Sequence, residues 1–207
     1  MGLKKSFDSK DNIIRVAFSL FLKKGFKEVT ITNIMEVTKL SKGAIYHHFK
    51  SKEEIYAATL ETYYFELLQP DGVDFNSGSF KKDIESLYNY VAELFHNIEN
   101  ISKNDSDYPI RNYFSFQLES EKNTAIRGQT TQAVAEFRKT VEDIVINGFS
   151  NHQIKPELDV KTITLQIIGM VEGVAVHHST LKDNVKEILL KKYQLVFDSF
   201  LSFICNE

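Results

Sequence analysis

Apolar residues recur at intervals of three and four along almost the whole chain, and this spacing restricts the possible folds more than any other feature. In the first such stretch Ile14, Ala17, Phe18 and Phe21 follow the i, i+3, i+4, i+7 pattern that places them on one face of a helix. No stretch alternates apolar and polar residues as a half-buried strand does. The pattern therefore predicts an all-α protein.

Capping residues, glycines and prolines divide this pattern into about nine helices. Gly25 follows the first helix, Thr30 and Ser41 are placed to cap two short ones, and Ser51 opens an S-x-x-E capping box. Pro109 is suited to a first helical turn. We expect helices at residues 9–24, 31–37, 42–49, 52–68, 80–101, 109–120, 124–149, 159–180 and 184–204.

Two short helices near the N-terminus are separated only by the four residues 38–41. We expect the first to bury Ile31, Ile34 and Val37, and the second to bury Ile45 and Phe49. Such a pair, joined by a tight turn, can place its second helix in a DNA major groove. The sequence therefore predicts a helix-turn-helix.

Charge is distributed unevenly along the chain. Residues 1–52 hold eleven Lys/Arg and four Asp/Glu, whereas the remaining 155 residues hold fourteen and twenty-four, so a net +7 precedes a net −10. A basic head on an acidic body is typical of a segment that meets a polyanion, although chance clustering is the alternative. We expect a DNA-binding domain at 1–52 and a regulatory domain at 53–207.

The third predicted helix has the composition of a contact surface. Gly43 and Ala44 carry almost no side chain, so the backbone of this helix can approach the bases or sugars of DNA closely. The hydrogen-bonding and charged side chains nearby belong to Lys42, Tyr46, His47, His48 and Lys52. The alternative interpretation is an exposed polar face without a function.

Residues 29–34 and 40–54, VTITNI and LSKGAIYHHFKSKEE, resemble the signature of the tetracycline-repressor (TetR/AcrR) family. The resemblance implies a three-helix DNA-binding domain followed by a helical domain for ligand binding and dimerisation. It also implies phosphate contacts for Thr30, Tyr46, His48 and Lys52. It implies contacts to bases or nearby backbone for Lys42, Gly43 and Ala44. The full set of expected DNA contacts is Thr30, Thr32, Ser41, Lys42, Gly43, Ala44, Tyr46, His47, His48 and Lys52.

The chain departs from the family pattern at two positions before the third helix. Met35 replaces a small residue, so we expect the helices to separate slightly or Met35 to fill a gap. Lys39 replaces the turn glycine, at a cost of about 1 kcal/mol if the backbone there is left-handed. Lys39 is also a candidate for an added phosphate contact.

The last two helices carry apolar stripes that suit either a core or a four-helix dimer interface. Gly169 and Gly173, one turn apart, would allow close helix approach. The stripes are Ile163, Ile167, Met170, Val171 and Val174 on one helix and Leu189, Val196, Phe197, Phe200 and Phe203 on the other. The family resemblance favours the interface.

Aromatic residues are frequent in the body of the chain. They predict either a cavity for a flat or lipophilic ligand, as the family resemblance implies, or an ordinary core. Our candidates for ligand contacts are Phe95, Tyr113, Phe116, Phe137 and Glu172. A metal site at His177-His178 is disfavoured, because adjacent helical residues point about 100° apart.

These features predict a DNA-binding transcriptional regulator. We expect a homodimeric repressor that a small lipophilic or aromatic effector releases from a palindromic operator; the alternative is an activator or DNA-organising protein without an effector. Nothing indicates an enzyme, a cofactor or a metal, since no nucleophile–base pair, metal cluster or phosphate-binding glycine loop is present. One cysteine and no apolar leader or span predict a cytoplasmic protein without a membrane partner.

Overall fold

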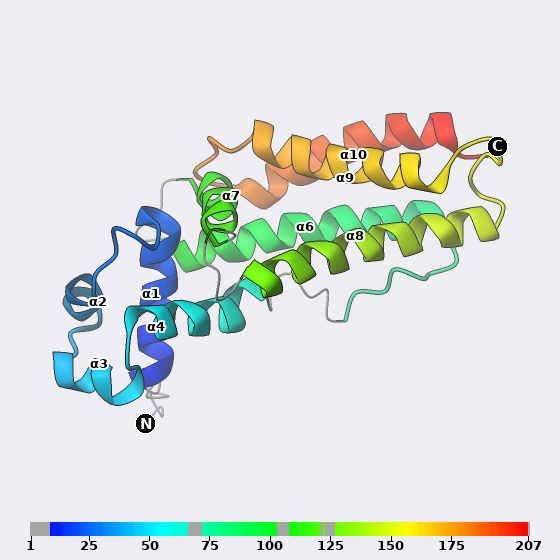
Figure 1. Ribbon diagram of the computed structural model, residues 1–207. Helices are drawn as coiled ribbons and strands as arrows, with labels where there is room; N and C mark the ends of the chain where they lie inside the picture. The colour runs from blue at the N-terminus through cyan, green and yellow to red at the C-terminus, as the bar shows by residue number, and fades with distance from the viewer. Residues whose placement is uncertain (1–8, 66–71, 103–107, 121, 123–126, 207) are drawn as a thin grey trace, which may run out of the picture.

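The computed structural model describes residues 9–65, 72–102, 108–120, 122 and 127–206 (Figure 1). Within these ranges the chain forms nine α-helices and one π-helical segment, and its only β-structure is an isolated bridge between Ile154 and Cys205. The elements are α1 Ser9–Lys24, α2 Ile31–Thr38, α3 Lys42–His48, α4 Lys52–Thr59, η1 Leu60–Phe65, α6 Phe80–Ser102, α7 Pro109–Ser120, α8 Arg127–Ser150, α9 Val160–His177 and α10 Val185–Ile204. The all-α prediction is confirmed.

The helices form a small head and an elongated body (Figure 1). Helices α1 to α3 and the start of α4 make the head, with α1 packed against α2 and α4. In the body α10 packs along α6, and α9 packs along α8. Helix α7 lies between the two parts and contacts α1, α6, α8 and α9, so it is positioned to join them.

Local signals set the helix ends in the head, as expected. Gly25 adopts a left-handed φ of 78° just after α1, which a residue with a Cβ rarely adopts. The Thr30 side chain caps α2, and the Ser51 hydroxyl accepts from the Glu54 N–H at 3.2 Å. The box at α4 is shifted by one residue, because the Glu54 carboxylate accepts from the Lys50 N–H at 2.6 Å.

One predicted core residue is on the surface instead. Ile34 is fully buried, and Ile31 and Met35 are partly buried against the core, but Val37 is 48% exposed. Thr38 is also partly buried, so the buried stripe of this short helix runs through Ile31, Ile34, Met35 and Thr38 and does not include Val37.

The fourth predicted helix changes its winding partway along. It runs as an α-helix to Thr59 and continues as a π-helix through Leu60–Phe65, while the predicted end at 66–68 lies outside the described residues. In a π segment each backbone hydrogen bond spans one residue more than in an α-helix, and such segments are frequent at functional sites. Helix α9 also ends earlier than predicted, at His177.

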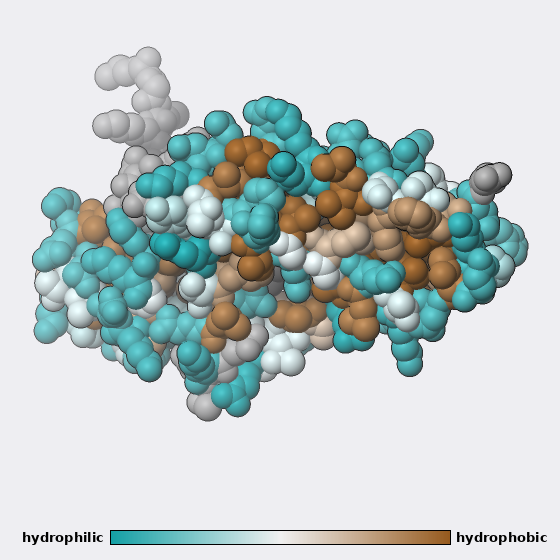
Figure 2. All heavy atoms as spheres, turned by 90° about the horizontal axis from the view of Figure 1, so that it is seen from above, coloured by the Kyte–Doolittle hydropathy of each residue, from teal (hydrophilic) through white to brown (hydrophobic). Residues whose placement is uncertain are grey.

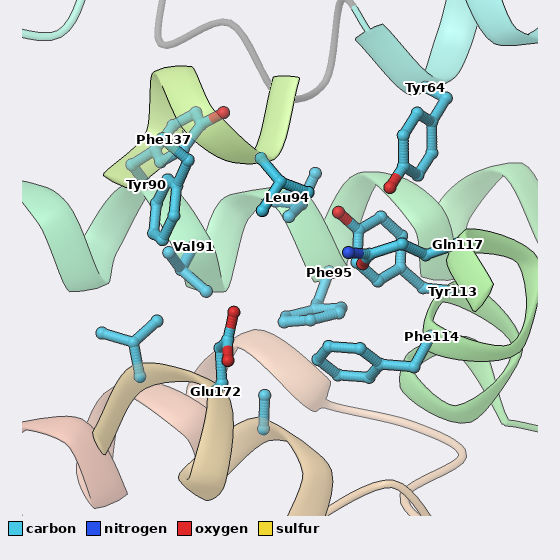
Figure 3. Close-up of a pocket in the computed structure, with 13 residues that line it drawn as sticks. Tyr64, Tyr90, Val91, Leu94, Phe95, Tyr113, Phe114, Gln117, Phe137 and Glu172 are labelled. Carbon is cyan, nitrogen blue, oxygen red and sulfur yellow. The ribbon is translucent and has the colours of Figure 1, made fainter. Parts of the chain in front are cut away.

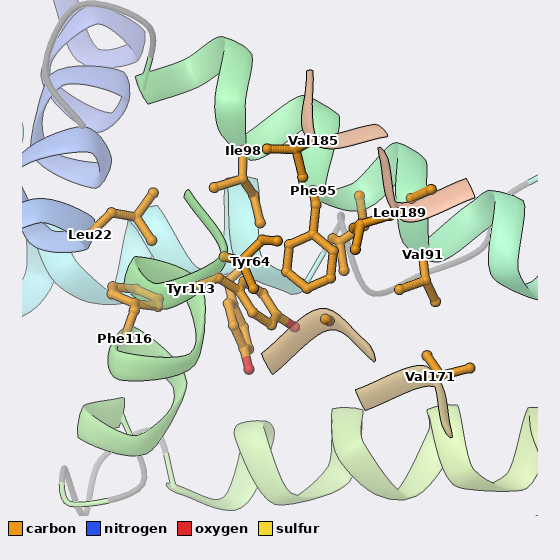
Figure 4. Close-up of a cluster of buried hydrophobic side chains, with 14 of the residues drawn as sticks. Leu22, Tyr64, Val91, Phe95, Ile98, Tyr113, Phe116, Val171, Val185 and Leu189 are labelled. Atoms are coloured by element: carbon orange, nitrogen blue, oxygen red, sulfur yellow. The ribbon is translucent and has the colours of Figure 1, made fainter. Parts of the chain in front are cut away.

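A single hydrophobic core runs from the head into the body. Figure 4 shows it continuing from Leu22 on α1, past Phe116 on α7, to Val171 on α9 and Leu189 on α10. The head therefore shares its core with the body.

No helix in the described ranges is both long enough and apolar enough to cross a membrane.

The apolar stripes of the last two helices divide between core and surface. Ile163, Ile167 and Val171 of α9 are buried, as are Leu189 and Phe197 of α10. The exposed apolar residues are Leu165 and Val176 on α9 and Leu195 and Phe203 on α10. Figure 2 looks onto this side of the body and shows hydrophobic side chains gathered along it. Apart from Phe203, the exposed residues differ from those that the sequence pattern selected.

Candidate nucleic-acid interface and ligand cavity

A left-handed residue makes the turn between α2 and α3. Lys39 has a φ of 60°, and its N–H donates to the Met35 carbonyl at 2.9 Å. Thr38 supports the turn: its hydroxyl donates to the Ile34 carbonyl at 2.8 Å and accepts from the Leu40 N–H at 3.3 Å. The left-handed backbone anticipated at Lys39 is present, and its side chain is exposed.

Helix α3 has one buried side and one exposed side. Ile45 and the following Phe49 are buried against the head. On the other side Tyr46 is 45% exposed, and Lys42 Nζ lies 5.8 Å from the centroid of its ring. None of the ten residues expected to contact DNA is buried: Thr30, Thr32, Ser41, Lys42, Gly43, Tyr46 and His47 are exposed, and Ala44, His48 and Lys52 are intermediate.

The packing within the protein does not require a glycine at position 43. A Cβ built on Gly43 would meet only the Ser41 hydroxyl, at 3.9 Å, which is ordinary contact. Glycine costs about 1 kcal/mol relative to alanine within a helix. The internal packing would therefore allow a larger residue, and the open surface beside Ser41 suits the close approach of another molecule.

The hydroxyls of Thr30 and Ser41 also hold the two helices in shape. Thr30 and Asn33 form a reciprocal box: the Asn33 N–H donates to Thr30 Oγ1 at 3.2 Å, and the Thr30 N–H donates to Asn33 Oδ1 at 3.0 Å. The Ser41 hydroxyl accepts from the Ala44 N–H at 3.2 Å. Both side chains thus stabilise helix N-termini.

Lys52 has a role that the sequence pattern did not reveal. Its ammonium group donates to the Phe26 carbonyl at 2.7 Å and to the Val29 carbonyl at 2.9 Å, and it lies 4.2 Å from the centroid of the Phe26 ring. Lysine has three donors, so one remains beyond these two bonds. Lys52 therefore fastens the loop between α1 and α2 onto the start of α4.

An aromatic cavity lies in the body between η1, α6, α7, α8 and α9 (Figure 3). Four of the five predicted ligand contacts line it, namely Phe95, Tyr113, Phe137 and Glu172. Sequence reasoning missed the other aromatic residues of its wall, which are Tyr64, Tyr90 and Phe114. The centre of a water-sized molecule can occupy about 60 Å³ of it, so a large ligand would have to displace side chains.

Phe116, the fifth candidate, does not line the cavity. It is 1% exposed, and its ring contacts those of Phe18, Tyr56 and Tyr64 at centroid distances of 5.4–5.6 Å. One face of α7 turns Tyr113 and Gln117 toward the cavity, whereas Phe116 points back toward α1. Phe116 therefore occupies a core position and not the position in the cavity wall that we predicted for it.

The polar groups of the cavity are partly removed from water. Burial raises the pKa of Tyr113 well above its ordinary value, and its ring stacks on Tyr64 with centroids 5.6 Å apart. Burial also raises the pKa of the Glu172 carboxyl, although one side of this residue is exposed. Glu172 points from α9 into the space beside Val91 and Phe95 (Figure 3).

Helix α7 connects this cavity to the head through Glu119. The Glu119 carboxylate accepts a hydrogen bond from the Phe26 N–H at 3.0 Å. A Cβ at Gly25 would lie 2.6 Å from Glu119 Oε2, so glycine permits this close approach. The buried Tyr56 hydroxyl has no described hydrogen-bond partner and is close enough for Glu119 to raise its pKa, after burial itself. No sequence motif marks Glu119.

In the described ranges no three His, Cys, Asp or Glu side chains gather into a possible metal site. His177 and His178 contact one another with ring centroids 5.2 Å apart, and His178 Nδ1 lies 2.8 Å from the Val174 carbonyl oxygen. This pair is thus a helix-end contact in the structure.

The sequence of the head and the fold of nearly the whole chain both match known proteins. Residues 13–59 match the family described as bacterial regulatory proteins, tetR family. The chain is 25% identical over 196 residues to the HTH-type transcriptional regulator QacR of Staphylococcus aureus, a match that covers 93% of this chain and 98% of QacR. It is also 31% identical over 90 residues to IcaR of the same species, the negative regulator of the biofilm operon icaADBC. This second match covers 44% of this chain and 47% of IcaR.

The fold also matches solved structures over nearly its full length. The ketosteroid transcriptional regulator KstR2 of Mycobacterium tuberculosis superposes with a TM-score of 0.73 at 16% identity, covering 98% of each chain. At this identity the likeness shows the fold alone. The three named proteins are transcriptional regulators.

Proposed function

Because this chain belongs to the TetR family of DNA-binding transcriptional regulators, we propose that it is a homodimeric repressor released from a palindromic operator by a small effector. The observation that carries the DNA-binding part is the exposed face of α3, where Gly43 leaves an open surface between Lys42 and Tyr46. We propose the ten residues named above as its DNA contacts, with residues 1–52 as the DNA-binding domain and 53–207 as the regulatory domain.

The exposed apolar residues of α9 and α10 support the dimer. Leu165, Val176, Leu195 and Phe203 are each more than half exposed and lie on two helices that contact one another. Large exposed apolar areas are uncommon on isolated monomers. A Cβ at Gly169 would meet nothing within 4 Å, so the backbone there is open to a partner helix. Two copies joined through this face would present two α3 helices to half-sites about 34 Å, or a multiple of it, apart.

The cavity supports the effector part of the proposal, since two connections run from it to the head. Helix α4 begins at Lys52, which holds the loop before α2, and continues into η1, whose Tyr64 lines the cavity. Helix α7 carries Tyr113 and joins the same loop through Glu119. An effector that favours a different position of these helices would shift the population away from the DNA-competent spacing.

Operator binding tests the DNA-binding part directly. Fluorescence anisotropy would measure binding of the full chain to inverted repeats upstream of its own gene, from low to high salt. We expect log affinity to fall linearly with log salt, with a slope of about −0.9 per phosphate contact. Lys42→Ala should reduce that slope by about one, whereas the matched control Lys139→Ala, exposed on α8, should leave it unchanged. Salt-independent binding would contradict the proposal.

The dimer is tested by the mass of the protein in solution. We expect sedimentation equilibrium to give twice the chain mass, and Leu195→Glu to give the single mass together with weaker operator binding. Leu118→Glu, at an equally exposed leucine on α7, is the control and should remain dimeric. A wild-type monomer that binds palindromes with full affinity would exclude the dimer.

A further inference from the structure

Helix α3, at the outer end of the head, finishes with two adjacent histidines (Figure 1). His47 is exposed and His48 is partly buried, and their ring centroids lie 5.1 Å apart. His47 follows Gly43 by four residues, and helical side chains lean toward the turn that precedes them. The His47 ring therefore borders the open surface beside Gly43, where we propose that DNA approaches.

Neither imidazole has an acidic partner in the described part of the chain. There the two rings contact one another, and neither makes an ion pair or a hydrogen bond to another side chain. The carboxylates on the elements next to α3 belong to Asp11 on α1, Glu36 on α2, and Glu53 and Glu54 on α4. Glu54 is engaged by the Lys50 N–H. A DNA phosphate would therefore be the first anion to lie against these rings.

The cations of this surface keep their charge while the histidines can change theirs. Lys10 Nζ lies 5.9 Å from the centroid of the Phe49 ring, and Lys42 contacts Tyr46 in the same way. The other cations on the adjoining elements are Arg15 on α1, Lys39 in the turn before α3, and Lys50 and Lys52 after it. Among ordinary side chains, histidine alone changes its charge between about pH 5 and 8.

A phosphate beside an imidazole favours its protonated form, because an opposite charge within about 4–6 Å stabilises the charged state of a titratable group. When one protonation state binds a ligand more tightly than the other, binding and protonation are linked. Binding then takes up protons, and the affinity rises as the pH falls.

We infer that operator binding takes up protons at His47 and His48, so that the regulator holds its operator more tightly at about pH 6 than at about pH 8. This inference rests on the proposed function and adds a second signal to it, because α3 would respond to pH as well as to DNA sequence. His47 should contribute more than His48, since it is the more exposed of the two and lies beside Gly43.

The test measures operator affinity by fluorescence anisotropy at several pH values and constant ionic strength. We expect the full-length protein to bind its operator at least about tenfold more tightly at about pH 6 than at about pH 8. The salt dependence gives an independent count of the protons. The slope of log affinity against log salt should steepen by about 0.9 for each histidine that gains a charge, or about 1.8 for His47 in both subunits.

Three variants assign the effect to α3. His47→Gln keeps hydrogen-bonding atoms but cannot gain a charge, so it should lose most of the pH dependence and of the steepening. His47→Lys carries a lasting charge and should show at about pH 8 the steep slope that the wild type shows at about pH 6. The control His177→Gln removes an exposed histidine at the end of α9, beside the proposed dimer face, and should keep the full pH dependence.

The outcomes separate this inference from the proposed function. A pH dependence that persists when both His47 and His48 are changed to Gln, or that disappears in His177→Gln, would overturn the inference. If the operator is bound with the same affinity across this pH range, only the proton linkage is wrong. If no inverted repeat is bound at any pH, the proposed regulatory function is wrong and the proton linkage falls with it.

Discussion

The helix-turn-helix and the aromatic cavity are built in opposite ways. All ten proposed DNA contacts fall within residues 30–52, and local caps at Thr30, Ser41 and Ser51 fix the helices that carry them. The cavity takes its wall from η1, α6, α7, α8 and α9, which tertiary packing alone brings together. We therefore expect substitutions on the exposed face of the head to weaken DNA binding without unfolding the protein. In the body we expect core substitutions to lower the free energy of unfolding much more than cavity substitutions do.

The largest expected effect tests that division in the body. Phe116→Ala should lower the free energy of unfolding by about 3–5 kcal/mol, because the ring is fully buried among other rings. Phe137→Ala should cost much less, since Phe137 is only partly buried at the cavity. Urea denaturation of both variants measures the difference. Similar losses would mean that the cavity and the core are not energetically distinct.

In the head, Gly43→Leu should separate folding from binding. We expect an unfolding free energy equal to or above that of the wild type, because leucine is the better helix former and the site is open. Operator affinity should fall about a hundredfold, roughly 2.7 kcal/mol, because the side chain would occupy the contact surface. Thermal denaturation and anisotropy on the same sample check both parts. A variant that binds DNA normally would remove Gly43 from the interface.

Glu119 is expected to matter to both regions at once. Glu119→Ala removes the acceptor for the Phe26 N–H and should lower stability by about 1–2 kcal/mol. It should also weaken operator binding measured by fluorescence anisotropy, because α7 then no longer holds the loop that precedes α2. Glu119→Gln keeps a carbonyl acceptor and should restore most of the operator affinity. Unchanged operator affinity in Glu119→Ala would leave Lys52 as the contact that positions this loop.

The smallest expected effect lies in the turn of the helix-turn-helix. Lys39→Gly should raise the unfolding free energy by up to about 1 kcal/mol, because the residue has a φ of 60°. Lys39→Ala is the control, since it removes the charge but keeps the Cβ and should not gain stability. Operator affinity that falls equally in both variants would identify Lys39 as a phosphate contact. Equal stability in both would argue against strain at this turn.

The ends of the helices in the head were predictable because the signals for them are local. Thr30, Ser41 and Ser51 each bond an N–H three residues further on, and Gly25 takes a left-handed conformation, whatever the rest of the chain does. The polar and small character of α3 was equally predictable, since Ile45 is the one buried residue of this short helix.

Other features depended on neighbours that a sequence pattern does not identify. Val37 and Phe116 both have helical apolar spacing, yet one faces solvent and the other the core, because the direction of packing decides the orientation of each stripe. The π segment at Leu60–Phe65 has no sequence signal that we recognise. Periodicity says that a helix has an apolar side but not which helix will cover it.

The sequence by itself determined the helical class, the positions of the short head helices and the basic, small-residue surface of α3, because each rests on interactions within a few residues. Only the tertiary structure decided that Lys52 holds the Phe26 loop, that Glu119 joins α7 to the head, and that Glu172 faces a ring of aromatic side chains. These pairings join residues distant in sequence, and their geometry follows from how the helices pack rather than from any local preference.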